Sequence, residues 1–444
     1  MKIISKIVPV SFLILITFFS IQCKLLKNIL SEEEEIDVIT TITSDDESAL
    51  SQALFYLWKK GGIIYIDTPI INFKEQGSLS VTGTLKGGII GIKQDNGEYP
   101  LFNFKAKRDS TELLYQYSSG IDVVGSNKFI KNIIIENAGA HGIFINGNKN
   151  IIENVITRYN GQSGIYISSG SNSNFLNYCY SYRNFNFYGK KVAGDGFTVE
   201  IGANNNVFNE CYAWDNIGNG FGYVYSEGEF NNGALTYTHS ASWNNGNINV
   251  FSGKYDFENG KDLDKNMWTI QEIIKSDDNF EKNYNNKIYN LDEAKIDSKP
   301  AVEYLEEYKS ENGGNGFNLG DENNEQNLIN KRTVDYCVSF DHRGKGFNNN
   351  KSLNFTVLIT NSVGFSNDMN YDLPYSFMKW SNNWSWSSNK KDIFDLDVFT
   401  KTPNDIKNAN KNFYSIRDKI MKAIYNNTFP EDCNFDKVIK SLSQ

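Results

Sequence analysis

An internal repeat limits the folds open to this chain more strongly than any other feature. The segment Leu176–Asn184 reads Leu-Asn-Tyr-Cys-Tyr-Ser-Tyr-Arg-Asn, and similar segments recur. With Cys179 as the reference, the equivalent positions are Ile133, Val155, Cys211, Ser240, Cys337 and Ser362. Five residues after each reference position stand Ala138, Asn160, Asn184, Asn216, Asn245, His342 and Asn367. Gly followed by an apolar residue comes soon after most copies, so each copy predicts two short strands separated by a polar turn.

The spacing between copies predicts the architecture. Uninterrupted copies lie about 22 to 25 residues apart, which suits one coil of a β-solenoid. We therefore predict an all-β, right-handed parallel β-helix, in which each internal strand pairs with the coils on both sides. The Cys, Val and Ser positions are expected to form one inward stack. The recurring Asn residues are expected to form a second stack, with amides that bond along the axis.

Two amphipathic segments flank the repeats. Ser44-Asp45-Asp46-Glu47 matches a capping box and predicts a short helix before the strand Ile63–Ile66. Near the other end, helical spacing predicts a second helix through Phe413, Ile416, Ile420 and Ile424. We expect these short helices to cap the two ends of the solenoid. The β-helix domain is placed at 44–390, with a polar insertion at 246–313 outside the coils and a C-terminal helical cap or tail at 391–444.

The first 43 residues predict export. Lys2, Lys6 and the apolar run Ile7–Phe19 have the pattern of a signal peptide over residues 1–23, and the run is too short for a membrane span. Residues 24–43, with the acidic run Glu32–Glu35, are expected to form a mobile segment. We expect a secreted, extracellular protein. The alternative is a lipid anchor at Cys23.

Composition excludes several classes. Among 444 residues, 40% are hydrophobic, enough for a large core, and the net charge of −9 argues against nucleic-acid binding. Four cysteines beyond Cys23 are too few for a disulfide scaffold, and we expect Cys179, Cys211 and Cys337 to be buried stack residues. We expect a monomer with no transmembrane span in the mature chain.

Four segments within the repeats share one family resemblance. They are Gly194-Asp195-Gly196-Phe197, Asn209-Glu210-Cys211-Tyr212-Ala213, Asn315-Gly316-Phe317-Asn318-Leu319-Gly320 and Gly344-Lys345-Gly346-Phe347-Asn348-Asn349-Asn350. Over about Leu50 to Asn389 the chain resembles polysaccharide lyase family nine. The resemblance implies a pectin lyase-like solenoid, a pectic polysaccharide substrate, and β-elimination at galacturonate assisted by calcium.

The calcium ligands implied by the resemblance are mostly replaced. An Asp before Gly-Phe in the family matches Asp195, whereas a cluster of carboxylates one coil later falls on Gly218, Asn219 and Gly222. Asp195 and Asn219 therefore remain as a degenerate calcium site, because calcium prefers about six to eight oxygen ligands and several charged ones. Asp215, Glu200 and Glu210 are neighbouring carboxylates, but alternation along strands does not place them on one face.

The family's catalytic base is also replaced. The resemblance puts the basic Lys at Asn318, and an amide has no basic lone pair with which to remove the C5 proton of galacturonate. Lys345 is the candidate surrogate base, with a structural or substrate-binding role as the alternative. Two hypotheses follow: a lyase with altered machinery, or a non-catalytic polysaccharide-binding or cell-surface β-helix protein.

Substrate contacts are expected from cations and aromatic residues. Lys190, Lys191 and Arg343 are candidates for a basic groove that holds a polyanion. Trp214 and Trp243 recur three residues after the reference position, and aromatic residues there would either face outward and stack on sugar rings or pack inside. If the cations are scattered, a neutral or esterified polysaccharide becomes the better ligand.

Overall fold

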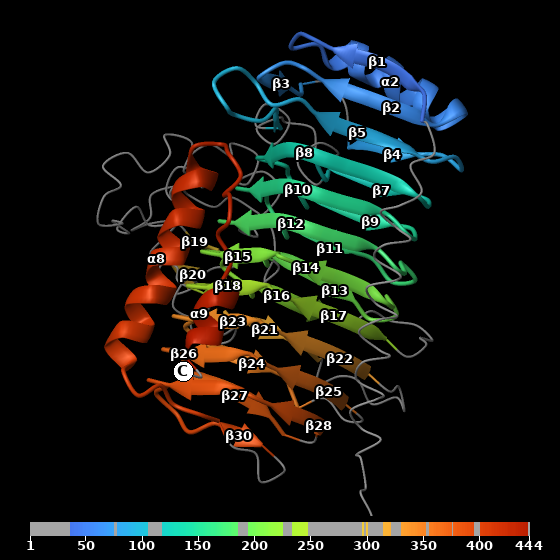
Figure 1. The fold of residues 1–444 in the computed structure, drawn as a ribbon. Helices are drawn as coiled ribbons and strands as arrows, with labels where there is room; N and C mark the ends of the chain where they lie inside the picture. Colours follow the sequence, from blue (N-terminus) through green and yellow to red (C-terminus); the bar gives the residue numbers. More distant parts are fainter. Residues whose placement is uncertain are drawn as a thin grey trace, which may run out of the picture. The chain divides into compact units, whose positions relative to one another are not determined.

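Two long parallel sheets form the body of the protein, and the chain adds strands to each in turn as it winds from coil to coil (Figure 1). The computed structural model describes residues 36–74, 78–104, 118–184, 194–224, 233–246, 295–296, 299–300, 314–320, 330–351, 355–374, 376–394 and 400–442. Val38–Gln444 form one compact unit.

The larger sheet has 18 strands in the part of the chain that is described. They are β1 (Val38–Ile42), β2 (Gly62–Ile66), β3 (Ile70–Asn72), β5 (Gly87–Gly91), β6 (Leu101–Asn103), β8 (Lys128–Glu136), β10 (Ile151–Arg158), β12 (Phe175–Tyr182), β14 (Asn206–Asn209), β15 (Tyr212–Trp214), β17 (Ala234–Thr238), β18 (Ala241–Trp243), β22 (Asn330–Asp335), β23 (Val338–Phe340), β25 (Phe355–Thr360), β26 (Val363–Phe365), β28 (Ser376–Ser381) and β29 (Trp384–Trp386).

The smaller sheet has ten strands among the described residues. They are β4 (Leu79–Thr82), β7 (Ile121–Val124), β9 (Ile143–Asn146), β11 (Ile165–Ile167), β13 (Phe197–Glu200), β16 (Phe221–Val224), β21 (Phe317–Asn318), β24 (Lys345–Asn348), β27 (Met369–Leu373) and β30 (Ile393–Phe394). Side chains alternate along these strands, so Phe197, Phe221 and Phe317 point into the core and their neighbours point out. The outward face of this ten-stranded sheet carries the candidate site.

Strand pairing confirms the predicted register. Val155 of β10 lies opposite Ile133 of β8 and opposite Cys179 of β12. Cys179, Cys211 and Cys337 are fully buried free thiols, as expected for an inward stack. The expected parallel β-helix is confirmed.

The asparagine stack is also confirmed. The backbone N–H of Asn160 donates to Asn184 Oδ1 (3.2 Å), that of Asn184 donates to Asn216 Oδ1 (3.1 Å), and that of Asn216 donates to Asn245 Oδ1 (2.9 Å). The residue before each of these positions adopts a left-handed conformation, for example Arg183 with φ of 54°. Such a corner leaves backbone groups without strand partners, and the buried amides satisfy them.

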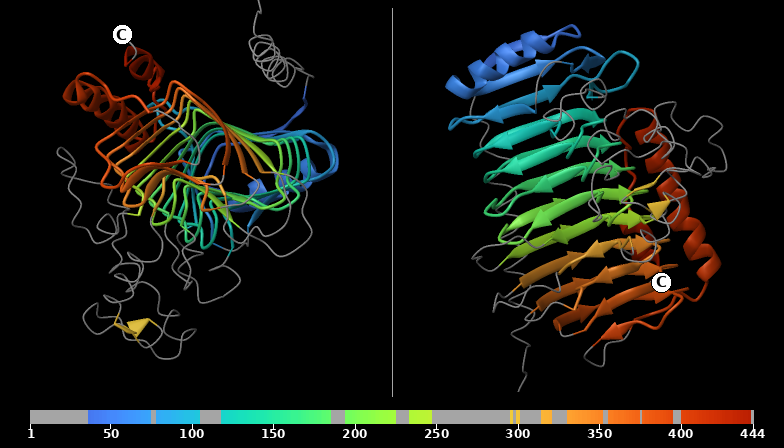
Figure 2. Two further views of the ribbon diagram at one scale, coloured as in Figure 1. Left: turned by 90° about the horizontal axis from the view of Figure 1, so that it is seen from below. Right: turned by 180° about the vertical axis from the view of Figure 1, so that it is seen from behind.

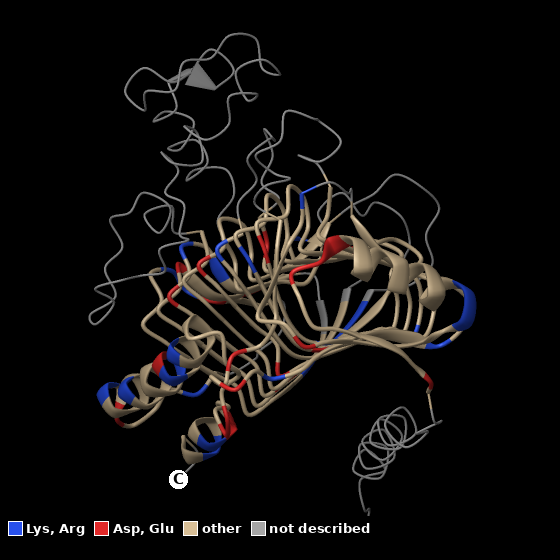
Figure 3. Cartoon of the chain, turned by 90° about the horizontal axis from the view of Figure 1, so that it is seen from above, with Lys and Arg blue, Asp and Glu red and all other residues tan. Residues whose placement is uncertain are grey.

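Helix α2 (Glu47–Lys60) covers the N-terminal end of the coils, as predicted. Its N-cap is Asp46, whose side chain accepts from the backbone N–H of Ala49 at 2.8 Å. Leu50, Leu54 and Leu57 are buried in the solenoid interior. Seen from above, α2 lies across the end of the coils, with basic residues at its C-terminal end (Figure 3).

The C-terminal helices lie elsewhere than predicted. Helices α8 (Ile406–Tyr425) and α9 (Asp436–Ser441) run beside the coils rather than across their end (Figure 2). Trp386 Nε1 donates to Asn410 Oδ1 (2.8 Å), whereas Tyr99, many coils away, donates its backbone N–H to Asn427 O (3.1 Å). The apolar stripe of α8 packs on the outside of the larger sheet, which carries a second cluster of buried aromatic residues. A capping position would leave that cluster in water.

Two predicted boundaries also move. Residues 38–42 at the end of the expected mobile segment form β1, because they pair with β2 and bury Ile42. The solenoid continues past 390, since β30 pairs with β27. Within the insertion 246–313, the described strands are β19 (Lys295–Ile296) and β20 (Lys299–Pro300), which pair antiparallel.

No helix in the described part of the chain is long and apolar enough to cross a membrane. Residues 1–35, with the predicted signal peptide and Cys23, lie outside the described residues.

Candidate functional site

A ladder of polar side chains crosses one end of four neighbouring strands in the ten-stranded sheet. Asn219 donates from its backbone N and its Nδ2 to Asp195 Oδ1, at 2.6 and 3.2 Å. Asn315 donates from the same two atoms to Asn219 Oδ1, both at 3.0 Å. The backbone N–H of Lys345 donates to Asn315 Oδ1 at 2.8 Å. The structure thus joins Asp195 and Asn219 by side-chain hydrogen bonds, whereas Lys345 reaches the ladder only through its backbone N–H.

Asp195 is enclosed and hydrogen-bonded on both oxygens. It is 3% exposed, and its Oδ2 accepts from Thr198 Oγ1 at 3.1 Å. A Cβ added at Gly222 would lie 1.9 Å from Oδ2, and one at Gly218 would lie 2.3 Å from Oδ1. The glycines at the family's carboxylate positions therefore leave the space that Asp195 occupies. Burial raises the pKa of Asp195 to about 6, although hydrogen bonds from Asn219 and Thr198 oppose the shift.

The donors around Asp195 do not fit the calcium site that the resemblance implies. One carboxylate is present where several would share the ion's charge, and its oxygens already accept hydrogen bonds. Among the described residues, no group of three or more His, Cys, Asp or Glu side chains is placed to hold a metal ion.

The position of the family's base lies two strands from Asp195. Asn318, at the end of β21, is 9% exposed and stands opposite Asn348 of β24. Its buried Oδ1 has no hydrogen-bond partner within the described residues. The candidate surrogate Lys345 forms an ion pair with Asp372 of β27, and its side chain is 31% exposed. An ammonium group held by a carboxylate offers no lone pair to a substrate proton.

A cavity of about 380 Å³ opens on the outward face next to this ladder. Strands β9, β11, β13 and β16 carry its walls. The lining residues are His141, Phe144, Gln162, Ser163, Tyr166, Asp195, Thr198, Glu200 and Val224. The cavity thus continues the predicted site toward the N-terminal coils.

Aromatic rings form one side of the cavity. Phe144 and Tyr166 face each other across β9 and β11, with centroids 5.7 Å apart and planes 16° apart. The ring of His141 lies 4.4 Å from that of Tyr166. All three are partly exposed, so the cavity offers an aromatic surface to a ligand.

Carboxylates form the other side. Glu200 Oε2 accepts from the backbone N–H of Ser169 at 2.9 Å, which orients the carboxylate. Burial raises the pKa of Tyr166, and the charges of Glu200 and Asp195 raise it further. Its hydroxyl is therefore protonated and donates to Glu200. The arrangement presents hydrogen-bond acceptors beside an aromatic surface.

His141 adds a neutral imidazole. Burial lowers its pKa to about 3, despite a hydrogen bond to the backbone carbonyl of Ser163. Its buried Nδ1 has no partner among the residues that the structure describes. A neutral ring that donates from one nitrogen keeps a lone pair on the other, so Nδ1 carries a lone pair that is buried behind the cavity surface.

Sequence reasoning missed most of the cavity. Phe144 and Tyr166 occupy the second position after the Gly of the repeat, on the same outward row as Thr198 and Asn318. Aligning that row across the coils would have found them. Glu200 was considered as a calcium ligand, and the structure places it in the cavity instead.

Trp214 and Trp243 are not substrate contacts. They lie on β15 and β18 of the other sheet and are 0% and 1% exposed. Their rings stack with centroids 5.0 Å apart, and Trp214 Nε1 donates to the hydroxyl of Tyr425 in α8. The repeat places them outside the coil, and α8 and α9 then bury them.

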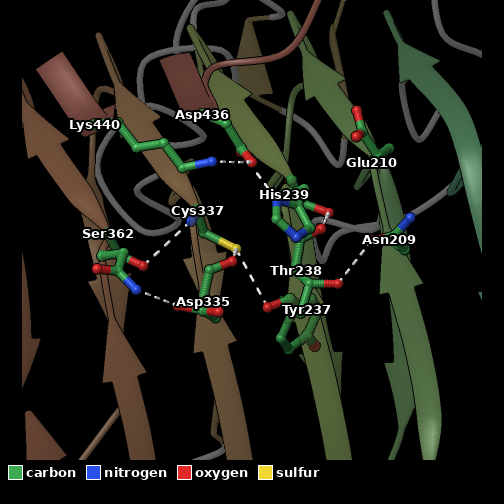
Figure 4. Close-up of polar contacts among 12 residues, drawn as sticks. Asn209, Glu210, Tyr237, Thr238, His239, Asp335, Cys337, Ser362, Asp436 and Lys440 are labelled. Carbon is green, nitrogen blue, oxygen red and sulfur yellow. Dashed lines mark hydrogen bonds and ion pairs between the residues drawn. The ribbon is translucent and has the colours of Figure 1, made fainter. Parts of the chain in front are cut away.

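Glu210 lies apart from the ladder, on the face that α9 covers. Near it, His239 Nδ1 donates to Asp436 Oδ1 at 2.9 Å (Figure 4). Asp215 also belongs to the helix-covered side, where it is buried beside Arg183. Neither carboxylate joins Asp195, since both belong to the larger sheet's side of the coil.

The predicted cations do not all fall within the described residues. Lys190 and Lys191 lie outside them. Arg343 is exposed in the turn before β24. The expected basic groove therefore stays a prediction.

Comparison with known proteins identifies the family. The model of the Pel9A-like right-handed β-helix region matches residues 39–263, just over half of the chain. The chain belongs to this family. Its fold is accordingly the right-handed parallel β-helix that the repeat predicted.

One solved structure supports the fold, and a second is similar at a lower TM-score. The crystal structure of pectate lyase Pel9A is 18% identical, with a TM-score of 0.53, over 84% of this chain and 81% of that one. A rhamnogalacturonan lyase is 14% identical, with a TM-score of 0.49, over 89% of this chain and 95% of that one. At 18% identity, the likeness to pectate lyase Pel9A shows a shared fold alone. A comparison with curated protein sequences gives no match.

Proposed function

We propose that this protein binds a pectic or related polysaccharide along the outer face of the ten-stranded sheet. The observation that carries the proposal is the cavity in which Phe144 and Tyr166 face Asp195 and Glu200. Aromatic surfaces pack on the apolar faces of sugar rings, and carboxylates accept hydrogen bonds from hydroxyl groups. Family membership supports a polysaccharide ligand, since the pectate lyase with this fold is named for a pectic substrate.

We further propose that the family's elimination reaction is impaired. That reaction needs a base near the C5 proton and positive charge near the substrate carboxylate. Asn318 supplies no base, Lys345 is bound to Asp372, and the donors at Asp195 do not fit calcium. A lyase that uses Lys345 is the alternative. It requires the pair with Asp372 to open when substrate binds.

Binding and elimination can be measured on the same protein. We expect retardation in native gels that contain pectin, and no unsaturated product by ultraviolet absorbance, with added calcium or with chelator. Tyr166→Ala should weaken binding by about tenfold or more, because it removes the ring that contacts both Phe144 and His141 in the aromatic surface. Tyr56→Ala is the matched control, since Tyr56 is 52% exposed on α2, which packs near β4 at the end of the sheet and not near the strands that line the cavity.

Calcium-dependent product that disappears in Asp195→Ala would contradict the proposed loss of elimination. Product that disappears only in Lys345→Met would support the alternative lyase. If folded protein binds none of the pectic polysaccharides, the binding proposal is wrong.

The site suits a protein that meets polysaccharide outside the cell. We propose export through the signal pattern at residues 1–23, with the mature protein secreted or lipid-anchored at Cys23. Mass spectrometry of the mature N-terminus distinguishes these forms. An uncleaved Met1 in the protein from its own host would reject both.

A further inference from the structure

We infer that the cavity between β9 and β13 takes an uncharged sugar residue and disfavours a free uronate. The inference rests on the proposed function, because it assumes that the cavity is a polysaccharide subsite. It narrows the ligand to neutral or methyl-esterified parts of a pectic chain.

The charged groups that line the cavity are both acceptors. The carboxylate of Glu200 lines the cavity, and that of Asp195 lies buried in its wall with both oxygens already hydrogen-bonded. A ligand must therefore bring donors, which sugar hydroxyl groups supply. A uronate carboxylate brings two further acceptors to a place that already has several.

The negative charge of the cavity also disfavours a free uronate. Among the described lining residues, two are carboxylates and none is Lys or Arg. Lys345 lies on β24, beyond β16 and β21, and its charge is paired with Asp372. Like charges repel strongly in a partly enclosed site, so a free carboxylate is disfavoured there. Esterification removes that charge and leaves the hydroxyl groups.

The aromatic surface does not depend on charge. Phe144 and Tyr166 offer adjoining rings on neighbouring strands, and such a surface binds the apolar face of a neutral sugar as well as that of an acidic one. The carboxylates therefore determine the selectivity, and the rings contribute affinity to both ligands.

The test compares three probes of equal length by isothermal titration calorimetry: a galactan oligosaccharide, an oligogalacturonide, and its methyl ester. We expect the galactan or the ester to bind about tenfold more tightly than the free acid at neutral pH. Glu200→Gln keeps the shape and removes one charge, so it should reduce that preference severalfold. Tyr166→Ala should weaken all three, and Tyr56→Ala none.

Tighter binding of the free acid would overturn the inference and leave the proposed function intact. Dependence of such binding on Lys190 or Lys191, measured with Lys190→Ala and Lys191→Ala, would trace the error to those cations. If folded protein binds neither pectin nor any of the three probes, the proposed function is wrong as well. An unchanged preference in Glu200→Gln would overturn the role of the cavity's charge.

Discussion

At the scale of single residues, one position of the asparagine stack is occupied by a histidine. His342 Nδ1 accepts from the backbone N–H of Asn245 at 3.2 Å, and its Nε2 lies 3.0 Å from the carbonyl of Ser242. The backbone N–H of His342 donates to Asn367 Oδ1 at 3.0 Å. Burial lowers the pKa of His342 to about 3, so the neutral ring reproduces the acceptor and donor of an amide.

His342 should therefore make the protein less stable as the pH decreases. The folded pKa lies below the unfolded value of 6.5. The unfolded chain thus binds more protons between these values, and the free energy of unfolding decreases as pH drops below about 6.5. We expect His342→Asn to lose less stability than wild type between about pH 6.5 and pH 4 in urea unfolding. His342→Ala should cost about 1 to 3 kcal/mol at neutral pH. An equal pH dependence in wild type and His342→Asn would contradict this assignment.

At the scale of elements, the C-terminal segment is held to the larger sheet by buried aromatic residues and by ionic contacts, among them His239 with Asp436 and Arg417 with Asp341. Trp214, Trp243 and Phe340 pack beneath it, with Phe435 near the last two. Asp436, at the start of α9, accepts from His239 and lies 3.8 Å from Lys440 Nζ (Figure 4). The helices therefore complete a second core on the outside of the coil.

The stabilisation from the pair of His239 and Asp436 should instead decrease as the pH rises. Burial alone lowers the pKa of His239, but the hydrogen bond with Asp436 and the charges of Asp436, Glu210 and Asp335 raise it above 6.5. Stability from this pair is present below the unfolded pKa and is lost as pH rises through the folded value. Asp436→Asn should cost less than about 1 kcal/mol near pH 5.5, because the pair is partly exposed, and less still near pH 9.

Urea unfolding at both pH values measures this difference. Asp418→Asn is the matched control, because Asp418 is an exposed carboxylate on α8 that pairs with Arg417. An equal loss in Asp436→Asn at both pH values would show that the imidazolium contributes nothing.

At the scale of the whole molecule, one apolar interior runs along the axis. Rings stack from coil to coil, with centroid distances of 4.9 Å for Phe197 and Phe221, 4.5 Å for Phe221 and Phe317, and 5.0 Å for Phe317 and Phe347. Helix α2 closes one end of this interior. A solenoid with an uncovered end exposes both its core and an unpaired strand edge.

Opening the α2 cap should therefore promote association. Leu57 is fully buried on the inner face of α2, whereas Tyr56 is exposed on the same helix. We expect Leu57→Asp to form dimers or larger species in light scattering, with a lower thermal midpoint, and Tyr56→Asp to behave as wild type. Monomeric Leu57→Asp with wild-type stability would show that the end needs no cap.

The repeat alone was sufficient to predict the coils, the inward stack of Cys179 and the asparagine stack. Each depends on residues that recur at one spacing and meet the same neighbours in every coil. The two helices were equally readable from local periodicity. Their positions were not, since α8 could cover the coil end or its side with the same apolar stripe. Burial of Trp214 and Trp243 follows from that choice.

The candidate site, too, is predictable from the sequence only in part. The replacement of the family's base by Asn318 and of its carboxylates by Gly222 is visible in the sequence. Only the tertiary structure shows that Asp195 fills the space above Gly222, that Lys345 is bound to Asp372, and that Phe144, Tyr166 and Glu200 share a cavity. These contacts join residues of different coils, where loops of different length intervene. Their geometry is set by side-chain packing across coils, which local sequence pattern does not encode.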